Sequence, residues 1–509
     1  MATLFYEPIA FAVDCHQKGE FAEAEKIYRE LLDENPENPD ALHLLGMLAN
    51  DTGQPEAARG LIGRAIHLRP EISYYHSNLG NVFQRLERFE DAEKCYREAL
   101  RLDPALPEAH NNLGNALSAL NRFPEAIGSF LEAVKRKPDY HQAFGNLACL
   151  LFRQEHWAEA AACYQEARRL APGCRPYAEG LAGVLAKWGE EFQEQGDHAR
   201  AIACYGQAAA LAPDDPGLHL SLADSLLSTG QFQSGWAEYE WRWRVKDYPT
   251  VSFRQPVWDG APLAGKRILL WAEQGLGDTI QFVRFAGAVK GAGGRVLFEC
   301  QPPLERLLGA CPGIDELIPF GSPLPDFDVH APLQSLPRIL GTTLETIPAP
   351  VPYLSADTGL VRAWETRLAA GRGCRVGLAW AGSPLNRYDP RRSIPKERFE
   401  PFRHIPGVEC FSLQQEDVPG DFAEAAALIA NLDLVISVDT AAAHLAGALG
   451  KPVWTLLPFA ADYRWLLQRA DSPWYPTMRL YRQPAPGDWD AVLTGVIQAL
   501  ENFGDERRR

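Results

Sequence analysis

The sequence lacks long apolar segments and any local pairing of its cysteines. No stretch of 18 uninterrupted apolar residues occurs among the 509 residues, and the N-terminal segment MATLFYEPIAFAVDCHQKGE has no cationic region. A membrane-spanning helix and a secretory signal are therefore not indicated, and we expect a cytoplasmic protein without membrane insertion. The ten cysteines form no CxxC pair and no cluster with histidine, so we expect neither a disulfide framework nor a zinc site.

The sequence is also short of basic residues. Its 50 Lys and Arg stand against 66 Asp and Glu, which gives a formal net charge of −16. Binding to a nucleic-acid backbone requires clustered positive charge, so we expect no nucleic acid as the main partner, although the balance allows a local basic patch. The length exceeds that of one ordinary domain and predicts two or three packed domains.

A period of 34 residues runs through the N-terminal half of the chain. Prolines, alanines, bulky residues and small residues each recur five times in fixed register. The series are Pro36, Pro70, Pro104, Pro138 and Pro172; Ala24, Ala58, Ala92, Ala126 and Ala160; Tyr28, Ile62, Tyr96, Phe130 and Tyr164; and Ala12, Gly46, Gly80, Gly114 and Ala148. A small residue lets one helix approach its partner, a bulky residue fills the gap between pairs, and proline ends the second helix. The period predicts a stack of helix pairs.

Two further units follow this stack. The sixth unit comes after 41 residues instead of 34, and the extra length is about two helical turns, which keeps the apolar face in phase. The seventh unit, residues 220–244, indicates a terminal repeat adapted to pack on another part of the chain. These units closely resemble the tetratricopeptide repeat family. The resemblance implies an α-solenoid over residues 1–249 that holds a protein or peptide, and its exposed faces allow a homo-oligomer.

Three asparagines recur within the array at the same period. Asn78, Asn112 and Asn146 each lie two residues before the small position. Asn inside a helix is roughly half a kcal/mol less favourable than Leu, and two interpretations are open: polar groups on a solvated wall or between helices, or amides that grip the backbone of an extended peptide. The spacing resembles the asparagine ladder of the O-GlcNAc transferase family, which implies that these residues bind a protein acceptor.

From about residue 250, short apolar runs alternate with helical patterns. The first set is RILLWA, RVLFEC, ELIPF and DVHAPL, and the second, after the connector APVPYL, is CRVGLAW, VECFSL, DLVISV and PVWTLLP. Continuous apolar strands with helical crossovers predict parallel sheets covered on both faces. We therefore expect two α/β domains, residues 250–355 and 356–509, with ligands between them at the carboxyl ends of the strands.

Two of these predicted strands end in the same dipeptide. Asp278-Thr279 follows the first strand of the first set, and Asp439-Thr440 follows a central strand of the second. Plain helix capping explains either pair. Capping also directs the N-terminus of the helix, with its free amides and partial positive charge, into the cleft, so both interpretations can hold together.

The segments around both dipeptides resemble one enzyme family. SVDTAAAHLAGALGKPV is similar to the C-terminal signature of the heptosyltransferase family (glycosyltransferase family 9), and GLGD is similar to the N-terminal Gly-Asp of that family. The resemblance implies two Rossmann-like domains in the GT-B arrangement, a nucleotide-sugar donor, and no metal or other cofactor. It places Asp439, Thr440, Ala441 and His444 at the donor diphosphate and makes Asp278 the general base.

A third segment, NRYDPRRSIP, is similar to the basic-x-aromatic-Pro segment of the same family. Arg392 then takes the place of its phosphate-binding lysine, while Ile394 replaces the aromatic residue and Ala441 replaces a glycine, so the donor stays undetermined. The whole arrangement, repeats joined to a GT-B half, resembles bacterial protein glycosyltransferases such as the flagellin-modifying enzymes.

Sugar transfer itself requires a base for the acceptor hydroxyl and positive charge for the leaving phosphate. Arg387, Arg391 and Arg392 concentrate positive charge in one loop of an acidic chain, and we predict that they bind the donor, a solvated turn being the alternative. The residues predicted to line the donor pocket are Gly275, Gly277, Phe459, Tyr463 and Trp465, with core packing as the alternative for the aromatic residues.

Other polar residues give weaker signals. The triplets Asp326-Phe327-Asp328 and Asp488-Trp489-Asp490 have the DxD form of a metal-bound sugar nucleotide, but short acidic triplets arise easily by chance, and we expect no metal. His330, at the end of a predicted strand, is equally consistent with a structural role and with a place at the cleft.

The sequence thus predicts an inverting glycosyltransferase that modifies Ser or Thr of a protein acceptor held by the repeats. Two alternatives are a transferase acting on a lipid-linked or polysaccharide glycan, with the repeats as a docking module, and a repeat scaffold whose transferase half has lost activity.

Overall fold

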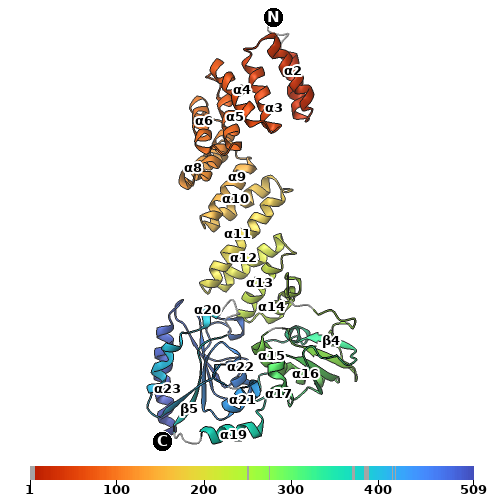
Figure 1. Ribbon diagram of the computed structural model, residues 1–509, viewed down its shortest axis with the longest axis vertical. Coiled ribbons are helices and arrows are strands. Elements are labelled where there is room, and N and C mark those ends of the chain that lie inside the picture. Colours follow the sequence, from red (N-terminus) through yellow and green to blue (C-terminus); the bar gives the residue numbers. More distant parts are fainter. Residues whose placement is uncertain are drawn as a thin grey trace. The chain divides into compact units, whose positions relative to one another are not determined.

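A computed structural model describes residues 6–248, 251–273, 275–368, 373–382, 389–414, 416–418 and 420–508. As predicted, an α-solenoid of tetratricopeptide repeats is followed by an α/β region with parallel sheets (Figure 1). The chain forms two compact units, Met1–Trp188 with Ala210–Ala212 and Gly189–Ala209 with Pro213–Arg509. The last repeats therefore belong to the same unit as the sheets, and the domain boundaries at residues 249 and 355 stay predictions.

The repeats consist of paired helices: from Tyr6 to Leu170 each helix packs on its neighbours in chain order, and the helices between Pro216 and Tyr239 pack on each other. The helices are α1 (Tyr6–Gln17), α2 (Phe21–Glu34), α3 (Pro39–Asp51), α4 (Pro55–Leu68), α5 (Ser73–Arg85), α6 (Phe89–Leu102), α7 (Pro107–Ala119), α8 (Phe123–Arg136), α9 (His141–Arg153), α10 (Trp157–Leu170), α11 (Arg175–Glu194), α12 (His198–Leu211), α13 (Pro216–Ser228) and α14 (Phe232–Tyr239), followed by the 3₁₀ helix η1 (Glu240–Arg244). Each of the five prolines of the period stands two residues after the end of a helix, as predicted.

The small and bulky residues of the period meet inside each pair. A Cβ atom added to Gly80 would lie 2.5 Å from the ring of Tyr96, and one added to Gly114 would lie 2.6 Å from the ring of Phe130. Both rings are fully buried. The glycines are therefore required by the close approach of the two helices.

The turn inside each pair has a second periodic feature. One residue per repeat adopts positive φ, and glycine occupies this position in some repeats and other residues in the rest. These residues are Gly19, Gly53, Glu87, Asn121, Glu155, Gly196 and Gly230. The left-handed conformation is unfavourable for Glu87 and Glu155, so the packing of the flanking helices, and not the local sequence, fixes these turns.

The longer sixth period is taken up by one helix. α11 has 20 residues, whereas α9, at the corresponding position of the preceding repeat, has 13. The division between the two compact units falls within α11.

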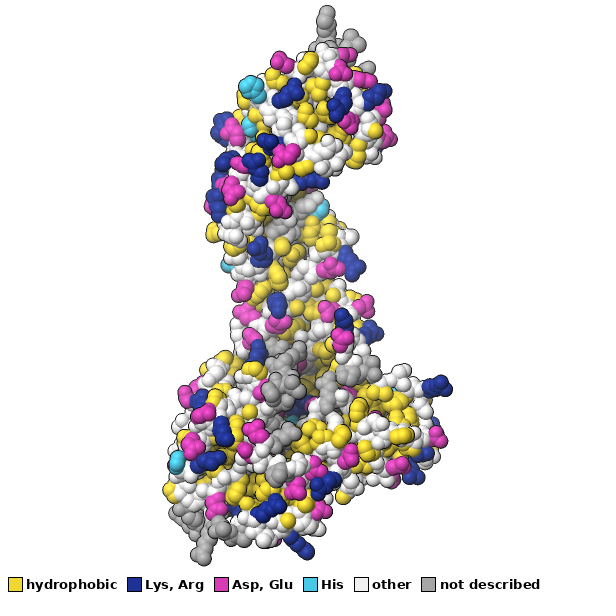
Figure 2. Space-filling view, in the orientation of Figure 1, with side chains coloured by type: hydrophobic (Ala, Val, Ile, Leu, Met, Phe, Trp, Pro, Cys, Tyr) yellow, Lys and Arg dark blue, Asp and Glu magenta, His cyan; other side chains and the backbone are white. Residues whose placement is uncertain are grey.

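Charged side chains of both signs are interspersed over the repeats (Figure 2). Many form pairs within one helix, and some connect repeats: Arg122 binds Glu93 at 2.7 Å and Glu125 at 2.7 Å, and Arg97 binds both glutamates as well. Such exposed pairs contribute little individually, about 0–1 kcal/mol. Their alternation keeps this surface free of a single-sign patch that would attract a polyanion.

The second unit contains two parallel sheets. The first has the order β3-β2-β1-β4, and the second has the order β6-β5-β7-β8-β9. The strands are β1 (Arg267–Trp271), β2 (Arg295–Cys300), β3 (Glu316–Pro319), β4 (Val329–Pro332), β5 (Cys374–Ala379), β6 (Val408–Ser412), β7 (Leu434–Val438), β8 (Val453–Leu457) and β9 (Met478–Arg482). Eight match the predicted apolar runs. The edge strand β9 was not predicted, because its sequence MRLYR alternates with charged residues and has no continuous apolar run.

Helices connect the strands and complete the two α/β layers. They are α15 (Leu276–Phe282), η2 (Val283–Phe285), α16 (Ala286–Gly291), η3 (Pro302–Leu304), α17 (Glu305–Leu308), η4 (Leu333–Ser335), α18 (Leu336–Ile339), α19 (Thr358–Leu368), α20 (Asp389–Arg392), η5 (Lys396–His404), α21 (Phe422–Ala430), α22 (Ala441–Ala448), η6 (Tyr463–Trp465) and α23 (Trp489–Arg508). β7 and β8 are buried along their whole length. Their apolar sequences therefore reflect burial on both faces.

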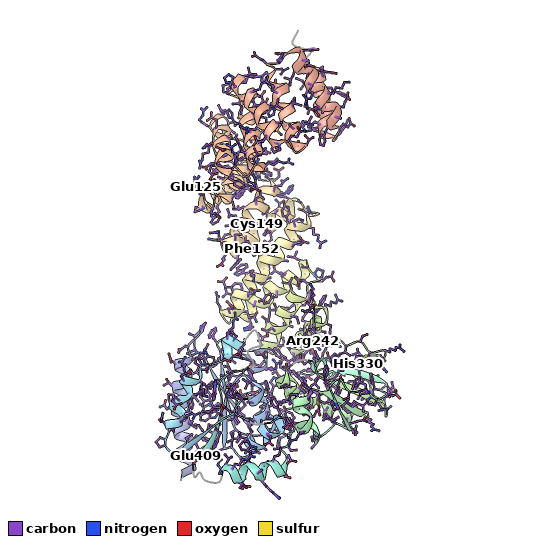
Figure 3. The ribbon with its side chains drawn as sticks, in the orientation of Figure 1. Glu125, Cys149, Phe152, Arg242, His330 and Glu409 are labelled. Atoms are coloured by element: carbon purple, nitrogen blue, oxygen red, sulfur yellow. The ribbon has the colours of Figure 1, made fainter. Side chains whose placement is uncertain are left out.

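The terminal repeat is attached to the first sheet by a buried ion pair. Arg242 of η1, labelled in Figure 3, donates from Nε to Glu273 Oε2 at 2.8 Å and from a terminal nitrogen to Ser335 Oγ at 2.7 Å. Glu273 follows β1, and both side chains of the pair are at most 2% exposed. Removing one partner of such a pair leaves an uncompensated buried charge.

Aromatic packing completes this attachment. The buried Trp236 of α14 contacts Phe282 of α15 and Tyr463 of η6 edge-on, with ring centroids 6.1 and 5.6 Å apart. The terminal repeat thus packs on both α/β layers, as its divergent sequence predicted.

Gly114→Ala is expected to lower the free energy of unfolding by about 1–3 kcal/mol, because the added methyl group overlaps the ring of Phe130. Gly128→Ala, in the partner helix α8, is the matched control, since a Cβ there meets nothing within 4 Å. The control should stabilise the protein by about 0.5–1 kcal/mol. Urea denaturation followed by circular dichroism measures both, and equal effects of the two variants would contradict the proposed packing.

Candidate functional site

The N-termini of two helices from different sheets meet at one place. α15 begins after β1, and α22 begins after β7, with Thr440 as its N-cap residue. A Cβ atom on Gly277 of α15 would lie 3.2 Å from His444 and 3.5 Å from Ala441 of α22. The carboxyl ends of the two sheets therefore face the same region, where parallel α/β folds bind ligands.

Asp278 lies at this meeting point, in the first turn of α15. Its side chain is 25% exposed, and it accepts a hydrogen bond from the backbone of Gly275. A Cβ atom on Gly275 would come within 2.9 Å of Asp278 Oδ2. Gly275 thus makes room for the carboxylate and Gly277 for α22, so internal packing explains both glycines, and their place in a donor pocket stays a prediction.

Arg464 of η6 connects the two sheets. Its guanidinium donates to Asp278 Oδ1, to both carboxylate oxygens of Asp462 at 2.8 Å, and from Nε to Gln281 Oε1 at 2.7 Å. Asp278 and Gln281 belong to α15, whereas Arg464 and Asp462 follow β8. Arg464 is only 11% exposed, so these charge-assisted bonds lie in a poorly solvated region.

Four carboxylates surround Arg464. They come from α13 (Asp224), α15 (Asp278), the end of β7 (Asp439) and the segment before η6 (Asp462), and the charge of Asp462 acts on the other three. Burial raises the pKa of Asp278 above its ordinary value, with Arg464 opposing that shift. Burial and the charge of Asp462 raise the pKa of Asp439 and also that of Asp224, the latter to about 7.

His444 is a buried neutral imidazole in this region. Its Nδ1 is 2.9 Å from the hydroxyl of Tyr475, its ring stacks on Trp465, and its Nε2 is 3.9 Å from Asp439 Oδ1. Burial and the neighbouring arginines Arg464, Arg284 and Arg392 hold the pKa of His444 well below its ordinary value. It can therefore take part in hydrogen bonds to an anion but does not supply positive charge at neutral pH.

The three arginines predicted to bind the donor have different surroundings. Arg392 is 19% exposed, is paired with Asp389 at 3.3 Å, and lies close enough to Asp278 and Asp439 to lower their pKa values. Arg391 is largely exposed and binds Glu194 of α11 at 3.1 Å. Arg387 lies outside the described residues. Of the described arginines in this loop, Arg392 therefore faces the carboxylates.

The predicted aromatic residues are mostly core residues. Trp465 is fully buried, and Tyr463 is 4% exposed between Trp236 and Tyr239. Phe459 is half-buried, and its ring lies 3.6 Å from the Cβ position of Gly196 in the repeats. Core packing accounts for Tyr463 and Trp465, and the predicted contact of all three with a donor stays untested.

Two buried polar atoms beside Arg464 have no hydrogen-bond partner among the described residues. They are the amide nitrogen of Gln281, a fully buried residue, and the hydroxyl of Tyr463. The charges of Arg464, Asp462 and Asp278 act on the pKa of the Tyr463 hydroxyl, so these groups lie close to it. Since buried polar groups normally bind protein or water, these two atoms are unsatisfied groups of the cluster that could bind a polar ligand if one entered.

Thr440 and the two DxD triplets make hydrogen bonds within the protein. Thr440 makes no side-chain cap bond, and its hydroxyl pairs with Ser437 at 2.9 Å instead. In the DxD triplets, Asp328 accepts from the backbone N–H of Arg267 and Asp488 from that of Ala491, so both are structural. Within the described residues, no group of three or more His, Cys, Asp or Glu side chains is arranged to hold a metal ion.

His330 is a structural residue of the first sheet. It is buried in β4, accepts a hydrogen bond from Trp271 Nε1 at 3.3 Å, and contacts Phe253 (Figure 3). Of its two predicted roles, the structural one is therefore observed.

The asparagine ladder lies in the first unit and is hydrogen-bonded between repeats. Asn78 donates to His43 of the preceding repeat at 2.9 Å, Asn112 donates to Asn81 at 2.9 Å, and Asn146 donates to Asn111 at 2.9 Å. These bonds agree with the interpretation that the amides connect adjacent helices. Each amide keeps a second hydrogen, whereas the oxygens of Asn78 and Asn112 already accept from Asn81 at 3.4 Å and from Asn111 at 3.0 Å, so contact with a peptide stays a prediction.

Sequence reasoning missed the residues that organise the site. Arg464 and Asp462 stand in the segment PFAADYRW, which was selected only for its aromatic residues, and Gln281 and Asp224 carried no motif. The one available signal was an Asp-x-Arg triplet directly after a predicted buried strand. Asp224 could not be found this way, because only the packing of α13 on η6 brings a repeat residue to the sheets.

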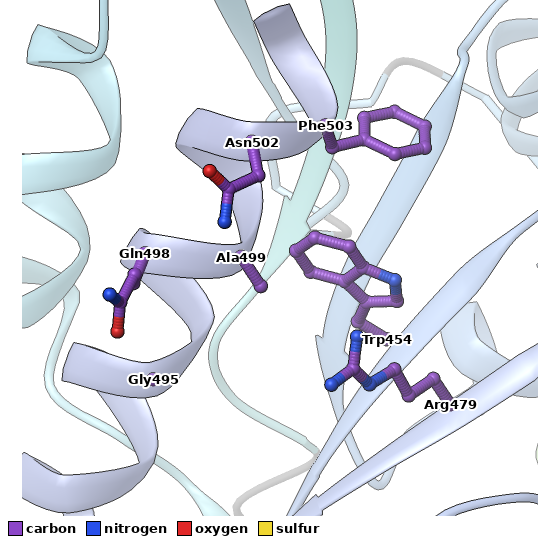
Figure 4. A pocket seen from close by; sticks show the side chains of 7 residues that line it. All are labelled: Trp454, Arg479, Gly495, Gln498, Ala499, Asn502 and Phe503. Carbon is purple, nitrogen blue, oxygen red and sulfur yellow. The ribbon is translucent and has the colours of Figure 1, made fainter. Parts of the chain in front are cut away.

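A separate hollow of about 390 Å³ lies between α23 and the strands β8 and β9 (Figure 4). Its lining comprises Trp454, Arg479, Gly495, Gln498, Ala499, Asn502 and Phe503. This lining shares no residue with the cluster of carboxylates and arginines around Arg464. The hollow is therefore not part of the candidate site.

Comparison with known families identifies the repeats. Residues 16–79, 77–141, 141–174 and 186–239 match the tetratricopeptide repeat, which indicates binding of a protein or peptide. Residues 419–461 match glycosyltransferase family 9 (heptosyltransferase), and this segment includes β7, Asp439 and α22. The repeats together with this segment suggest a glycosyltransferase.

One curated relative is Protein FlbA of Caulobacter vibrioides. It is 28% identical over 345 residues, which are 58% of this chain and 58% of the relative. The chain thus spans less than two thirds of the length of that relative. The substrate and the acceptor are not specified by this similarity.

Several solved repeat proteins resemble parts of the chain. TTC0263, a thermophilic TPR protein of Thermus thermophilus, is 21% identical with a TM-score of 0.32, covering 35% of this chain and 98% of its own. PilF of Pseudomonas aeruginosa is 19% identical with a TM-score of 0.35, covering 42% and 93%. These likenesses are too low to inform function. No described helix is long and apolar enough to cross a membrane.

Asp224→Asn is expected to stabilise the protein at alkaline pH. Folding raises the pKa of Asp224 from its ordinary value near 3.8 to about 7, so the folded state binds this proton more tightly and loses stability as pH rises from about 4 to 7. At pH 8 the free energy of unfolding of the variant should therefore exceed that of the wild type by about 1–3 kcal/mol, and the variant should unfold at a higher temperature. This difference in stability should shrink towards pH 4.

Thermal unfolding at pH 8 and pH 5 measures this effect. Asp214→Asn is the control, because Asp214 is 94% exposed and its replacement should give no pH-dependent difference. A pH-independent difference for Asp224→Asn would contradict the burial of its charge.

Proposed function

We propose that the chain is a glycosyltransferase that moves a sugar from a nucleotide-activated donor to a Ser or Thr hydroxyl of a protein. The observation that carries the proposal is the meeting of Asp278, in the first turn of α15, with the N-terminus of α22. α22 lies in the segment that matches glycosyltransferase family 9. In this proposal the two parallel sheets form a GT-B arrangement with its cleft at their carboxyl ends.

The N-terminus of α22 is suited to the donor diphosphate. The first amides of a helix have no partner within the helix and carry partial positive charge. Here these amides belong to residues from Ala441 onward, next to Thr440 and His444, with Arg392 as a nearby cation. We assign the diphosphate to this helix end, where amide hydrogen bonds stabilise the charge that develops on the leaving group.

Asp278 is suited to act as the general base. The acceptor oxygen attacks the anomeric carbon, its proton passes to the Asp278 carboxylate, and the bond between that carbon and the phosphate oxygen breaks. The nucleoside diphosphate leaves with the electron pair. Attack on the face opposite the leaving group inverts the anomeric centre. The raised pKa of Asp278 supports this role, because a base works best when its pKa approaches the working pH.

The repeats then supply the protein acceptor. Tetratricopeptide repeats indicate protein or peptide binding, and the ladder of Asn78, Asn112 and Asn146 offers amide groups that pair with a peptide backbone irrespective of its sequence. The competing acceptor, a lipid-linked or polysaccharide glycan, needs no such groups on the repeats.

The donor class is tested first by thermal stabilisation. A panel of UDP-, GDP-, ADP- and CMP-sugars is added to the full-length protein, and a bound donor raises the unfolding temperature by mass action. If no member of the panel stabilises the protein or is consumed by it, the scaffold alternative replaces the proposed enzyme.

Asp278→Asn is expected to reduce transfer about 100-fold or more while the variant still binds the donor, because the amide cannot accept the proton. The residual hydrogen bond to Gly275 is compatible with Asn. Transfer of labelled sugar to acceptor protein measures the effect, and turnover within a few-fold of wild type would contradict the role of Asp278 as general base. In the wild type, kcat/KM should fall as pH drops through the raised pKa of Asp278.

Asn112→Ala is expected to raise KM for a protein acceptor several-fold, since it removes the central rung of the ladder. Hydrolysis of the donor in the absence of acceptor should be unchanged, which serves as the internal control for the transferase half. If transfer to protein is unaffected and a free glycan is the better acceptor, the docking-module alternative is favoured.

A further inference from the structure

We propose that Arg464 is shared between the base and the donor: it holds Asp278 in an ion pair, and the donor diphosphate competes with Asp278 for the same guanidinium. This inference rests on the proposed function, since it assumes a nucleotide-diphosphate donor at α22. It assigns to Arg464 the neutralisation of the leaving group, and it couples donor binding to release of the base.

The bonds of Arg464 define what a donor has to displace. Its N–H groups are engaged by Gln281, by both carboxylate oxygens of Asp462 and by Asp278. A guanidinium offers five N–H donors in a planar fork, and this fork matches a phosphate as well as a carboxylate. To bind Arg464, two neighbouring phosphate oxygens therefore need the edge of the guanidinium that now donates to Asp278. The bonds to Asp462 and Gln281 meanwhile keep the Arg464 side chain in place.

Arg464 is also close to the proposed phosphate site. Its charge lowers the pKa values of both Asp439 and His444, which flank the N-terminus of α22. A shift of the guanidinium from α15 towards α22 stays within this cluster, because Gly277 brings the two helix ends into contact. The competition thus requires a side-chain movement and no rearrangement of the sheets.

The charge balance makes this exchange necessary for an anionic donor. Asp278, Asp439 and Asp462 outnumber the neighbouring arginines Arg464 and Arg392, and Asp224, whose pKa is raised to about 7, adds a partial negative charge at neutral pH. A diphosphate that entered while Arg464 stayed fully paired would meet surplus negative charge in a poorly solvated site, where like charges repel strongly. Transfer of Arg464 to the phosphate removes that repulsion and leaves Asp278 available to the acceptor hydroxyl.

Independent features point to a ligand at Arg464. The amide nitrogen of Gln281 and the hydroxyl of Tyr463 are buried beside it without partners among the described residues. The segment that follows Arg464 is strained, with φ of 48° at Leu466 and 50° at Gln468, and it is fixed by a 2.7 Å bond from Arg482 to the carbonyl of Leu466. Strained backbone that the surroundings hold in place is concentrated at functional sites.

The proposal predicts opposite effects of the two partners on nucleotide affinity. Isothermal titration of the full-length protein with UDP, GDP, ADP and CDP identifies the nucleoside diphosphate that the wild type binds. Arg464→Gln should weaken its binding about tenfold or more, because a charge-assisted contact is lost. Asp278→Asn should tighten its binding about three- to tenfold, since the competitor for Arg464 loses its charge.

A purely structural ion pair gives a different pattern, because loss of either partner would then weaken binding. Arg464→Lys, which keeps the charge but not the fork, should lie between wild type and Arg464→Gln. Arg469→Gln is the matched control: it removes an arginine of the same segment that is paired with Asp471 instead of with the cluster, and it should leave affinity unchanged.

Each outcome decides the inference. Unchanged or weakened binding in Asp278→Asn overturns it, and so does unchanged binding in Arg464→Gln; if Arg464→Gln does not fold, the Asp278→Asn measurement alone decides. If the wild type binds no nucleoside diphosphate, the proposed function fails and this inference fails with it. If the wild type binds a nucleoside diphosphate but both variants change its affinity in the same direction, the proposed role of Arg464 is wrong and the proposed function still stands.

Discussion

The close contact between the N-termini of α15 and α22 determines the geometry of the whole site. Gly277 permits it, because a Cβ atom there would lie only 3.2 Å from His444. Two helix N-termini that point at one region each carry a partial positive charge of about half an elementary charge, and they repel each other unless negative groups lie between them. The carboxylates of Asp278 and Asp439, with Asp462 nearby, supply that negative charge. The acidic character of the site is thus partly a consequence of how the sheets meet.

The same constraint explains why Arg464 is indispensable to the arrangement. Helix ends and arginines together have to balance four carboxylates, three of which have pKa values raised by burial and by their neighbours. Arg464 is placed where it contacts both sheets at once, through Asp278 on one side and Asp462 on the other. An anion that enters here changes the balance for all of these groups, which links binding of a donor to the state of the proposed base.

The terminal repeat belongs to this arrangement as much as the sheets do. Arg242 and Glu273 form a buried pair that attaches η1 to the end of β1, and Trp236 packs on residues of both α/β layers. Through α13 the repeat also brings Asp224 to the site. The site is therefore partly built by a repeat.

The sequence by itself determined the repeat array, the apolar strands and the two Asp-Thr junctions. Each of these depends on local patterns: a 34-residue period, buried strands with continuous apolar runs, and a change from a strand pattern to a helix pattern. The period predicted small residues at Gly80 and Gly114 and bulky residues at Tyr96 and Phe130, but the rings lie inside the helix pairs and not between pairs as predicted. The edge strand β9 was not predicted, because a half-exposed strand with charged residues has no such local signal.

The tertiary structure alone decided which polar residues share one site. Asp224, Gln281 and the Asp462–Arg464 segment are far apart in sequence and carry no common motif, and Arg391, adjacent to Arg392, pairs with the repeats instead of the carboxylates. Pairing between distant charges depends on burial and on the direction of each side chain, and neither is encoded in spacing along the chain. The sequence therefore predicted a base and a helix end, and the packing of three elements supplied the arginine between them.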